Sequence, residues 1–108
     1  MLDNEKKGRL LDAPAGEGAL CKKLKNKEFD VYACDIDPSQ FKLKDIECMK
    51  VDLNEPLPLP YQSSSFDYIT CVEGLEHIEN PWNVIREFSR VLKKGGKLII
   101  TTPNVASL

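Results

Sequence analysis

Four carboxylate side chains stand at or just past the ends of short apolar runs, a spacing that could build one polar site. They are Asp12, Asp35, Asp52 and Glu73, and the single histidine of the chain, His77, follows soon after the last of them. Carboxylates accept hydrogen bonds from hydroxyl and amino groups, and a neutral imidazole can take up a proton near pH 7. Four carboxylates at adjacent strand ends would be unusual for a purely structural role, so we expect a ligand site there, with His77 as a candidate general base if a hydroxyl reacts.

A glycine turn follows the first of these carboxylates. The segment Pro14-Ala15-Gly16-Glu17-Gly18 resembles half of a dinucleotide-binding fingerprint, but the third glycine is missing. A phosphate-binding turn offers a helix N-terminus to an anion, and Glu17 at that place would oppose one. No lysine or arginine is available in the turn to hold phosphates. The turn therefore favours a nucleoside that lacks phosphate and carries positive charge.

The hydrophobic pattern predicts the elements that must position these residues. Apolar runs predict five strands, at residues 9–13, 29–35, 47–51, 66–72 and 97–102. Helices are expected at residues 19–27 and from Asn80-Pro81 to a stop at Gly95-Gly96, with one helical turn at 38–41 and a proline-rich loop at 53–65. This order predicts an open, mainly parallel α/β sheet, whose ligands lie outside the carboxyl ends of the strands.

Composition narrows the class of protein and its surroundings. The 108 residues suit one domain, 1–108, and their net charge of −2 argues against a nucleic-acid partner. The apolar runs are far shorter than the ~20 residues that cross a bilayer, so no membrane association is expected. The four cysteines form no C-x-x-C pair, and Cys34 and Cys71 stand inside apolar runs. We expect reduced thiols and a cytoplasmic location.

Motifs along nearly the whole chain resemble those of one enzyme family. They are Leu10-Leu11-Asp12-Ala13-Pro14-Ala15-Gly16-Glu17-Gly18, Asp35-Ile36-Asp37-Pro38, Val51-Asp52-Leu53, Leu57-Pro58, Ser65-Phe66-Asp67-Tyr68, Glu73-Gly74-Leu75-Glu76-His77, Arg90-Val91-Leu92-Lys93-Lys94-Gly95-Gly96 and Thr102-Pro103-Asn104. In this order they resemble class I S-adenosylmethionine-dependent methyltransferases, most closely the small-molecule "type 11" group. The resemblance implies a Rossmann-like sheet of order 3-2-1-4-5. It also implies a partial domain that lacks the last two strands of the full fold.

The resemblance also implies roles for individual residues around S-adenosylmethionine. Asp35 would accept both ribose hydroxyls, Ile36 would lie on the adenine, and Asp52 and the Leu53 N–H would meet its amino group and a ring nitrogen. Glu73 would lie beside the methyl group and the substrate entrance. Glu73 and His77 are the candidate catalytic residues, His77 as a base if the acceptor is a hydroxyl. The remaining expected cofactor-binding residues, which surround the methionine part, are Asp12, Ala13, Ala15, Gly16 and Gly18. Pro14 departs from the family pattern, which usually has glycine there.

The function that this implies is methyl transfer to a small-molecule acceptor through oxygen, nitrogen or carbon. Three alternatives remain: a cofactor-binding scaffold or incomplete fragment, a metal-assisted O-methyltransferase using Glu73, Glu76 and His77, and a nucleotide-binding dehydrogenase. No metal site is expected, because a closed site needs further ligands. The strand at 97–102 would form an edge of the sheet, so we also expect self-association through it.

Overall fold

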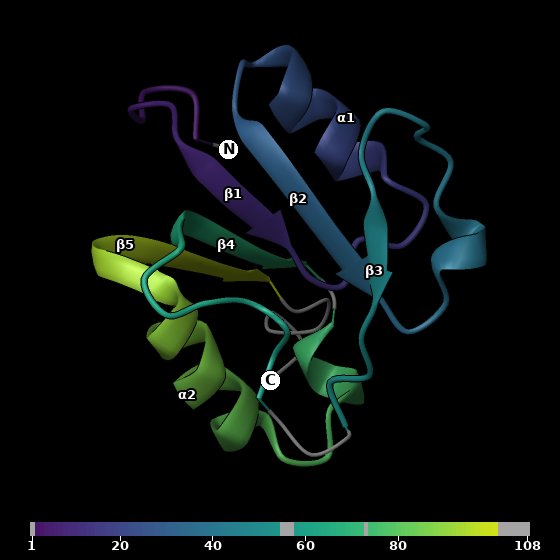
Figure 1. Ribbon diagram of the computed structural model, residues 1–108, viewed down its shortest axis with the longest axis vertical. Helices are drawn as coiled ribbons and strands as arrows, with labels where there is room; N and C mark the ends of the chain where they lie inside the picture. The colour runs from purple at the N-terminus through teal and green to yellow at the C-terminus, as the bar shows by residue number, and fades with distance from the viewer. Residues whose placement is uncertain (1, 55–57, 73, 102–108) are drawn as a thin grey trace, which may run out of the picture.

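Five parallel strands form one sheet in the computed structural model, which describes residues 2–54, 58–72 and 74–101. The strands are β1 (Arg9–Asp12), β2 (Asp30–Asp35), β3 (Cys48–Lys50), β4 (Phe66–Val72) and β5 (Leu92–Thr101). Their order in the sheet is β3-β2-β1-β4-β5, as predicted, with β3 at one edge and β5 at the other (Figure 1). The helices are α1 (Ala19–Asn26) and α2 (Pro81–Val91), with 3₁₀ turns η1 (Pro38–Gln40) and η2 (Leu75–His77).

The parallel register brings the carboxyl ends of the central strands together. Asp12 at the end of β1 pairs with Ala33 of β2 on one side and with Thr70 of β4 on the other. The polar residues that follow β1, β2 and β3 therefore leave the sheet at the same edge, as the rule for open α/β sheets requires. The chain turns back at this edge through the glycine turn, η1 and η2 (Figure 1).

Alternate residues of the strands face two separate hydrophobic cores, one under each helix. Leu10 and Tyr68 pack with Cys21 and Leu24 of α1. On the other face, Leu11, Cys34 and Ile69 pack with residues of α2, namely Val84, Phe88 and Val91. Cys34 and Cys71 are fully buried free thiols, as their place in apolar runs predicted. None of the described helices combines the length and apolar composition needed to span a bilayer.

The expectation that α2 would end at Gly95-Gly96 is wrong. The helix ends at Val91, and Leu92 is already extended, with φ −76° and ψ 142°. The backbone N–H groups of Ser64 and Ser65 donate to the carbonyls of Arg90 and Val91 over 2.9 and 2.8 Å, so a distant loop satisfies the helix end.

Strand β5 therefore begins earlier than its predicted start at Lys97. Leu92 pairs with Phe66 and Lys97 with Tyr68, so β5 advances five residues while β4 advances two. The extra residues bulge out of the ladder at Gly95, whose φ of 82° is a conformation that glycine adopts without strain. The two glycines thus shape an irregular strand rather than the end of the helix.

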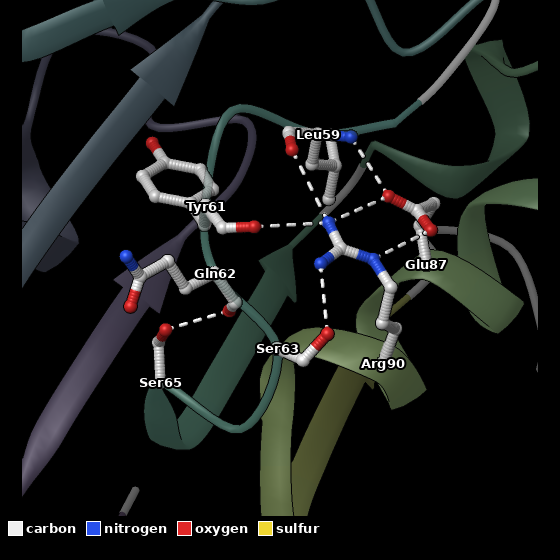
Figure 2. Close-up of polar contacts among 7 residues, drawn as sticks. All are labelled: Leu59, Tyr61, Gln62, Ser63, Ser65, Glu87 and Arg90. Atoms are coloured by element: carbon white, nitrogen blue, oxygen red, sulfur yellow. Dashed lines mark hydrogen bonds and ion pairs between the residues drawn. The ribbon is translucent and has the colours of Figure 1, made fainter.

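The proline-rich connection between β3 and β4 lies against α2. Arg90 donates to the carbonyls of Leu59 (3.2 Å) and Tyr61 (3.0 Å) and to Ser63 Oγ (3.1 Å). Glu87 accepts from the Leu59 N–H at 2.7 Å and pairs with Arg90 at 2.9 Å (Figure 2). We call this set of contacts the Arg90–Glu87 clamp. It fixes residues 59–63, none of which lies in a helix or a strand.

Candidate functional site

Two neighbouring cavities, each of about 290 Å³, open at the carboxyl edge of the sheet. They share two wall residues, Pro14 and Asp35, so a ligand that fills both must pass these residues. The glycine-turn cavity is further lined by Asp12, Ala15, Gly16, Glu17, Ala19, Leu20 and Val72. The second, here called the β3-side cavity, is further lined by Cys34, Ile36, Val51, Asp52, Leu53, Asn54, Gly74, His77 and Ile78.

Asp35 occupies the border between the cavities and is held there by backbone amides. The Gly16 N–H donates to its Oδ2 at 2.8 Å, and the Asp37 N–H donates to its Oδ1 at 3.0 Å. A carboxylate offers about four lone-pair directions, so each oxygen keeps capacity for one more donor. Asp35 is thus oriented by two protein donors and can accept two more from a ligand.

Asp37, the next carboxylate along the chain, accepts hydrogen bonds from residues that follow it directly in the sequence. Its Oδ1 accepts from the N–H of Ser39 at 3.2 Å and its Oδ2 from the side-chain amide of Gln40 at 3.4 Å. Bonds from Ser39, then from Gln40, lower the pKa of the Asp37 carboxyl. This is the Asx-type cap of η1, which explains why Asp35 and not Asp37 belongs to the cavity walls.

The glycine turn divides its two glycines between different tasks. Gly16 lines the cavity with φ 57°, a left-handed conformation with open space where a Cβ would stand. Gly18 caps α1, and a Cβ there would meet the Phe41 ring at 2.9 Å. Gly18 is therefore needed for packing and lies outside the set of residues that line the two cavities. Ala13 also lies outside the cavity walls, because it is fully buried in the core and donates its N–H to the Thr70 carbonyl.

Asp12 lies deepest in the glycine-turn cavity and is almost fully buried. Its Oδ1 accepts from the Thr70 hydroxyl at 2.8 Å and its Oδ2 from the Cys21 thiol at 3.3 Å. Burial raises the pKa of Asp12 to about 6, although the bonds from Thr70 and Cys21 act in the opposite direction. Asp12 is thus a buried, hydrogen-bonded carboxylate in the floor of the cavity.

The β3-side cavity offers apolar walls with one carboxylate among them. Ile36 is 56% exposed and lines this cavity. Leu53 and Ile78 also line the cavity, and Asp52 accepts from the Asn54 N–H at 2.9 Å. A flat, partly apolar ring with a donor at its edge matches these walls.

His77 lines the β3-side cavity together with Ile36 and Asp52, not the glycine-turn cavity. Glu73, the other candidate catalytic residue, lies outside the described residues. Within residues 2–54, 58–72 and 74–101, no three His, Cys, Asp or Glu side chains are arranged to hold a metal ion. His77 thus shares one cavity with Ile36 and Asp52.

The charge of both cavities is negative. None of the described residues that line them is lysine or arginine, whereas Asp12, Glu17, Asp35 and Asp52 are all present. Glu17 precedes the cap of α1 instead of lying in its first turn, and its exposed carboxylate is 3.4 Å from Lys42 Nζ. Such walls favour a ligand with cationic groups and without phosphates.

Sequence reasoning missed two wall features that depend on distant contacts. Gly74 lies so close to Pro14 that a Cβ on Gly74 would stand 2.3 Å from the proline Cδ. Asn54 forms hydrogen bonds with the backbone of His77 and Glu79, more than twenty residues away. The glycine in Glu73-Gly74 was a usable signal for close approach. Nothing in the pattern around Asn54 indicated its partners.

Comparisons with known proteins agree on one family. The model of a family described as "Methyltransferase domain" matches residues 11–100. A ubiquinone biosynthesis O-methyltransferase of Xanthomonas oryzae pv. oryzae is 35% identical over 104 residues, which cover 89% of this chain and 43% of that protein.

Two solved structures share the fold. The PH0226 protein of Pyrococcus horikoshii has a TM-score of 0.79 at 24% identity, with 97% of this chain and 50% of that one covered. A SAM-dependent methyltransferase of Aquifex aeolicus has a TM-score of 0.71 at 21% identity, covering 87% and 55%. The chain thus spans about half the length of these proteins or less. The family match and the 35% identity to the Xanthomonas protein show that the chain belongs to the methyltransferase domain family.

Proposed function

We propose that the two cavities together bind S-adenosylmethionine and that the protein transfers its methyl group to a small molecule. The observation that carries this proposal is Asp35, which the Gly16 and Asp37 amides orient at the border of both cavities. A ribose lies between the base and the amino-acid part of this cofactor. Its two hydroxyls are the two donors that Asp35 can still accept.

The remaining walls suit the two ends of the same ligand. The β3-side cavity has Ile36 for an adenine face and Asp52 for its amino group. The glycine-turn cavity has Ala15, Gly16 and negative charge for a cationic methionine end. When bound, the cofactor supplies a methyl group on a positively charged sulfur, ready for in-line displacement. The protein's own contribution is alignment of the reactants and exclusion of water.

The acceptor is proposed from the relatives. The ubiquinone biosynthesis O-methyltransferase that resembles this chain is named for transfer to oxygen. We infer a hydroxyl of a small molecule as acceptor, with nitrogen and carbon acceptors as the alternatives. His77 would support the adenosine in this scheme, and Glu73 stays the candidate for contact with the acceptor.

Calorimetric titration of the chain tests the binding half of this proposal. S-adenosylmethionine and S-adenosylhomocysteine should both bind, whereas NAD and ATP, whose phosphates meet negative walls, should give no measurable heat. Binding of NAD in preference to S-adenosylmethionine would instead support the dehydrogenase alternative. Release of S-adenosylhomocysteine in the presence of small phenols then separates an enzyme from a cofactor-binding scaffold.

A further inference from the structure

Asn54 connects the two sides of the β3-side cavity. Its side-chain Nδ2 donates to the His77 carbonyl at 3.3 Å, and the Glu79 N–H donates to its Oδ1 at 2.8 Å. Its own N–H donates to Asp52 Oδ1 at 2.9 Å. One residue thus contacts the carboxylate on one wall and the backbone of the opposite wall.

These walls come from different connections of the chain. One wall is Asp52–Asn54, directly after β3, and the other consists of Gly74, His77 and Ile78, between β4 and α2. In the described part of the chain, the hydrogen bonds that join these two segments are the two made by the Asn54 amide. The amide therefore ties the two walls together by hydrogen bonds, in addition to the packing of Leu53 against the core cluster that contains Ile78.

A second attachment holds the same loop farther along. The Arg90–Glu87 clamp binds Leu59, Tyr61 and Ser63 to α2, and Leu59 is buried in the core (Figure 2). This attachment does not use Asn54. Loss of the Asn54 amide should thus release the wall beside the cavity while the rest of the loop stays on the helix.

We propose that Asn54 is a positioning residue that prebuilds the β3-side cavity for the adenosine of the cofactor. The inference rests on the proposed function, since it assumes that this cavity receives the base. A wall that is already in place spares the ligand the entropy of ordering it. Loss of two neutral hydrogen bonds should weaken binding of S-adenosylmethionine by about five- to thirtyfold.

The experiment compares three variants by calorimetry with S-adenosylmethionine and by thermal melting. Asn54→Ala removes both bonds to the opposite wall, and Asn54→Asp keeps an acceptor for the Glu79 N–H but loses the donor to the His77 carbonyl. The matched control is Asn83→Ala, because Asn83 lies on α2 and its side chain bonds to Arg86 of the same helix. We expect Asn54→Ala to lose the most affinity for S-adenosylmethionine and Asn54→Asp to lose less. Asn83→Ala should bind within twofold of the parent.

A spectroscopic readout separates positioning from general stability. His77 is the single histidine, so its imidazole resonances can be followed without assignment of other histidines. Asn54→Ala should shift these resonances in the unliganded protein, and Asn83→Ala should leave them in place. A merely stabilising residue would lower the melting temperature without changing the dissociation constant at a temperature where the variant is folded.

Two results would overturn the inference. One is an Asn54→Ala protein that binds within twofold of the parent with unchanged His77 resonances. The other is an Asn54→Asp protein that binds S-adenosylmethionine with parental affinity. This second result is the deciding one in the case that Asn54→Ala does not fold. Failure of the parent chain itself to bind S-adenosylmethionine would contradict the proposed function instead. In that case the His77 resonances still report whether Asn54 positions the wall.

Discussion

The backbone N–H of Gly16 donates a 2.8 Å hydrogen bond to Asp35 Oδ2, which joins the glycine turn after β1 to the end of β2. The bond needs a turn that points its amide back toward the neighbouring strand, and Gly16 achieves this with φ 57°. The same carboxylate borders both cavities. The turn and the strand end therefore form one preorganised unit rather than two independent motifs.

The first prediction compares the two neighbouring aspartates. Asp35→Ala removes a charged acceptor from the border of the cavities, whereas Asp37→Ala removes only the cap of η1. Loss of hydrogen bonds to a charged acceptor costs about 1.5–3 kcal/mol, roughly ten- to a hundredfold in Kd. Calorimetry should show that loss for Asp35→Ala and a much smaller one for Asp37→Ala. Equal losses would mean that the ribose acceptor is assigned to the wrong residue.

The second prediction concerns the pH dependence of stability. Burial raises the pKa of Asp12 to about 6 from an ordinary 3.8, so the folded state binds this proton more tightly than the unfolded state. The stability that Asp12 contributes is therefore complete below about pH 4 and is lost as the pH rises through 6. A shift of this size corresponds to about 3 kcal/mol at most.

Asp12→Asn isolates this contribution because the amide cannot ionise. The amide oxygen can still accept from Thr70, the nearer of the two partners. Urea unfolding of the parent and the variant should be compared at pH 4, 5, 6 and 7. As the pH rises from 4 to 7, the free energy of unfolding of the variant should increase relative to that of the parent. A difference that stays constant over this range would show that Asp12 does not titrate there.

The third prediction uses the close contact of Gly74 with Pro14. In Gly74→Ala the new Cβ would stand 2.3 Å from Cδ and 2.7 Å from Cγ of the proline ring, which cannot rotate away. Overpacking of this kind destabilises by about 1–3 kcal/mol, and here it also displaces a residue shared by both cavities. We expect Gly74→Ala to lower both the melting temperature and the affinity for S-adenosylmethionine.

Gly8→Ala provides the control for this substitution. Its Cβ would also meet a close neighbour, Asp67, with Oδ2 at 2.4 Å and Cγ at 2.8 Å, so the substitution introduces comparable overpacking. The position lies before β1, at the opposite end of that strand from the cavities. Gly8→Ala should leave cofactor affinity unchanged. A loss of affinity equal to that of Gly74→Ala would indicate a general loss of stability.

The sequence predicted most of what is local in this fold. Strands formed at the continuous apolar runs. The family resemblance supplied the strand order, which the sheet confirms. The end of α2 was placed wrongly because its carbonyls are satisfied by Ser64 and Ser65, which come from another loop.

The candidate site also contains residues that the sequence identified and contacts that it did not. Asp35 and Asp52 were found because each follows a strand, and strand ends converge in a parallel sheet. The partners of Asp12 were not predictable, since Thr70 is 58 positions away and its hydroxyl meets the carboxylate only through strand pairing. His77 was named as a candidate base because it is the single histidine of the chain. Its actual neighbours in the cavity, Ile36 and Asp52, depend on how η2 packs.

The last prediction concerns the edge of the sheet. Within residues 2–54, 58–72 and 74–101, β5 pairs with β4 and with no other strand, and its residues Leu98, Ile99 and Ile100 are only partly buried. Exposed strand edges of this kind pair with other chains, so this chain should self-associate through β5 at micromolar concentration in sedimentation. Ile99→Lys places a charge on that edge and should shift the population toward monomer. Met49→Lys makes the same change at the opposite edge, on β3, and should leave the association unaltered. A parent chain that sediments as a monomer, or equal effects of the two lysines, would contradict association through β5.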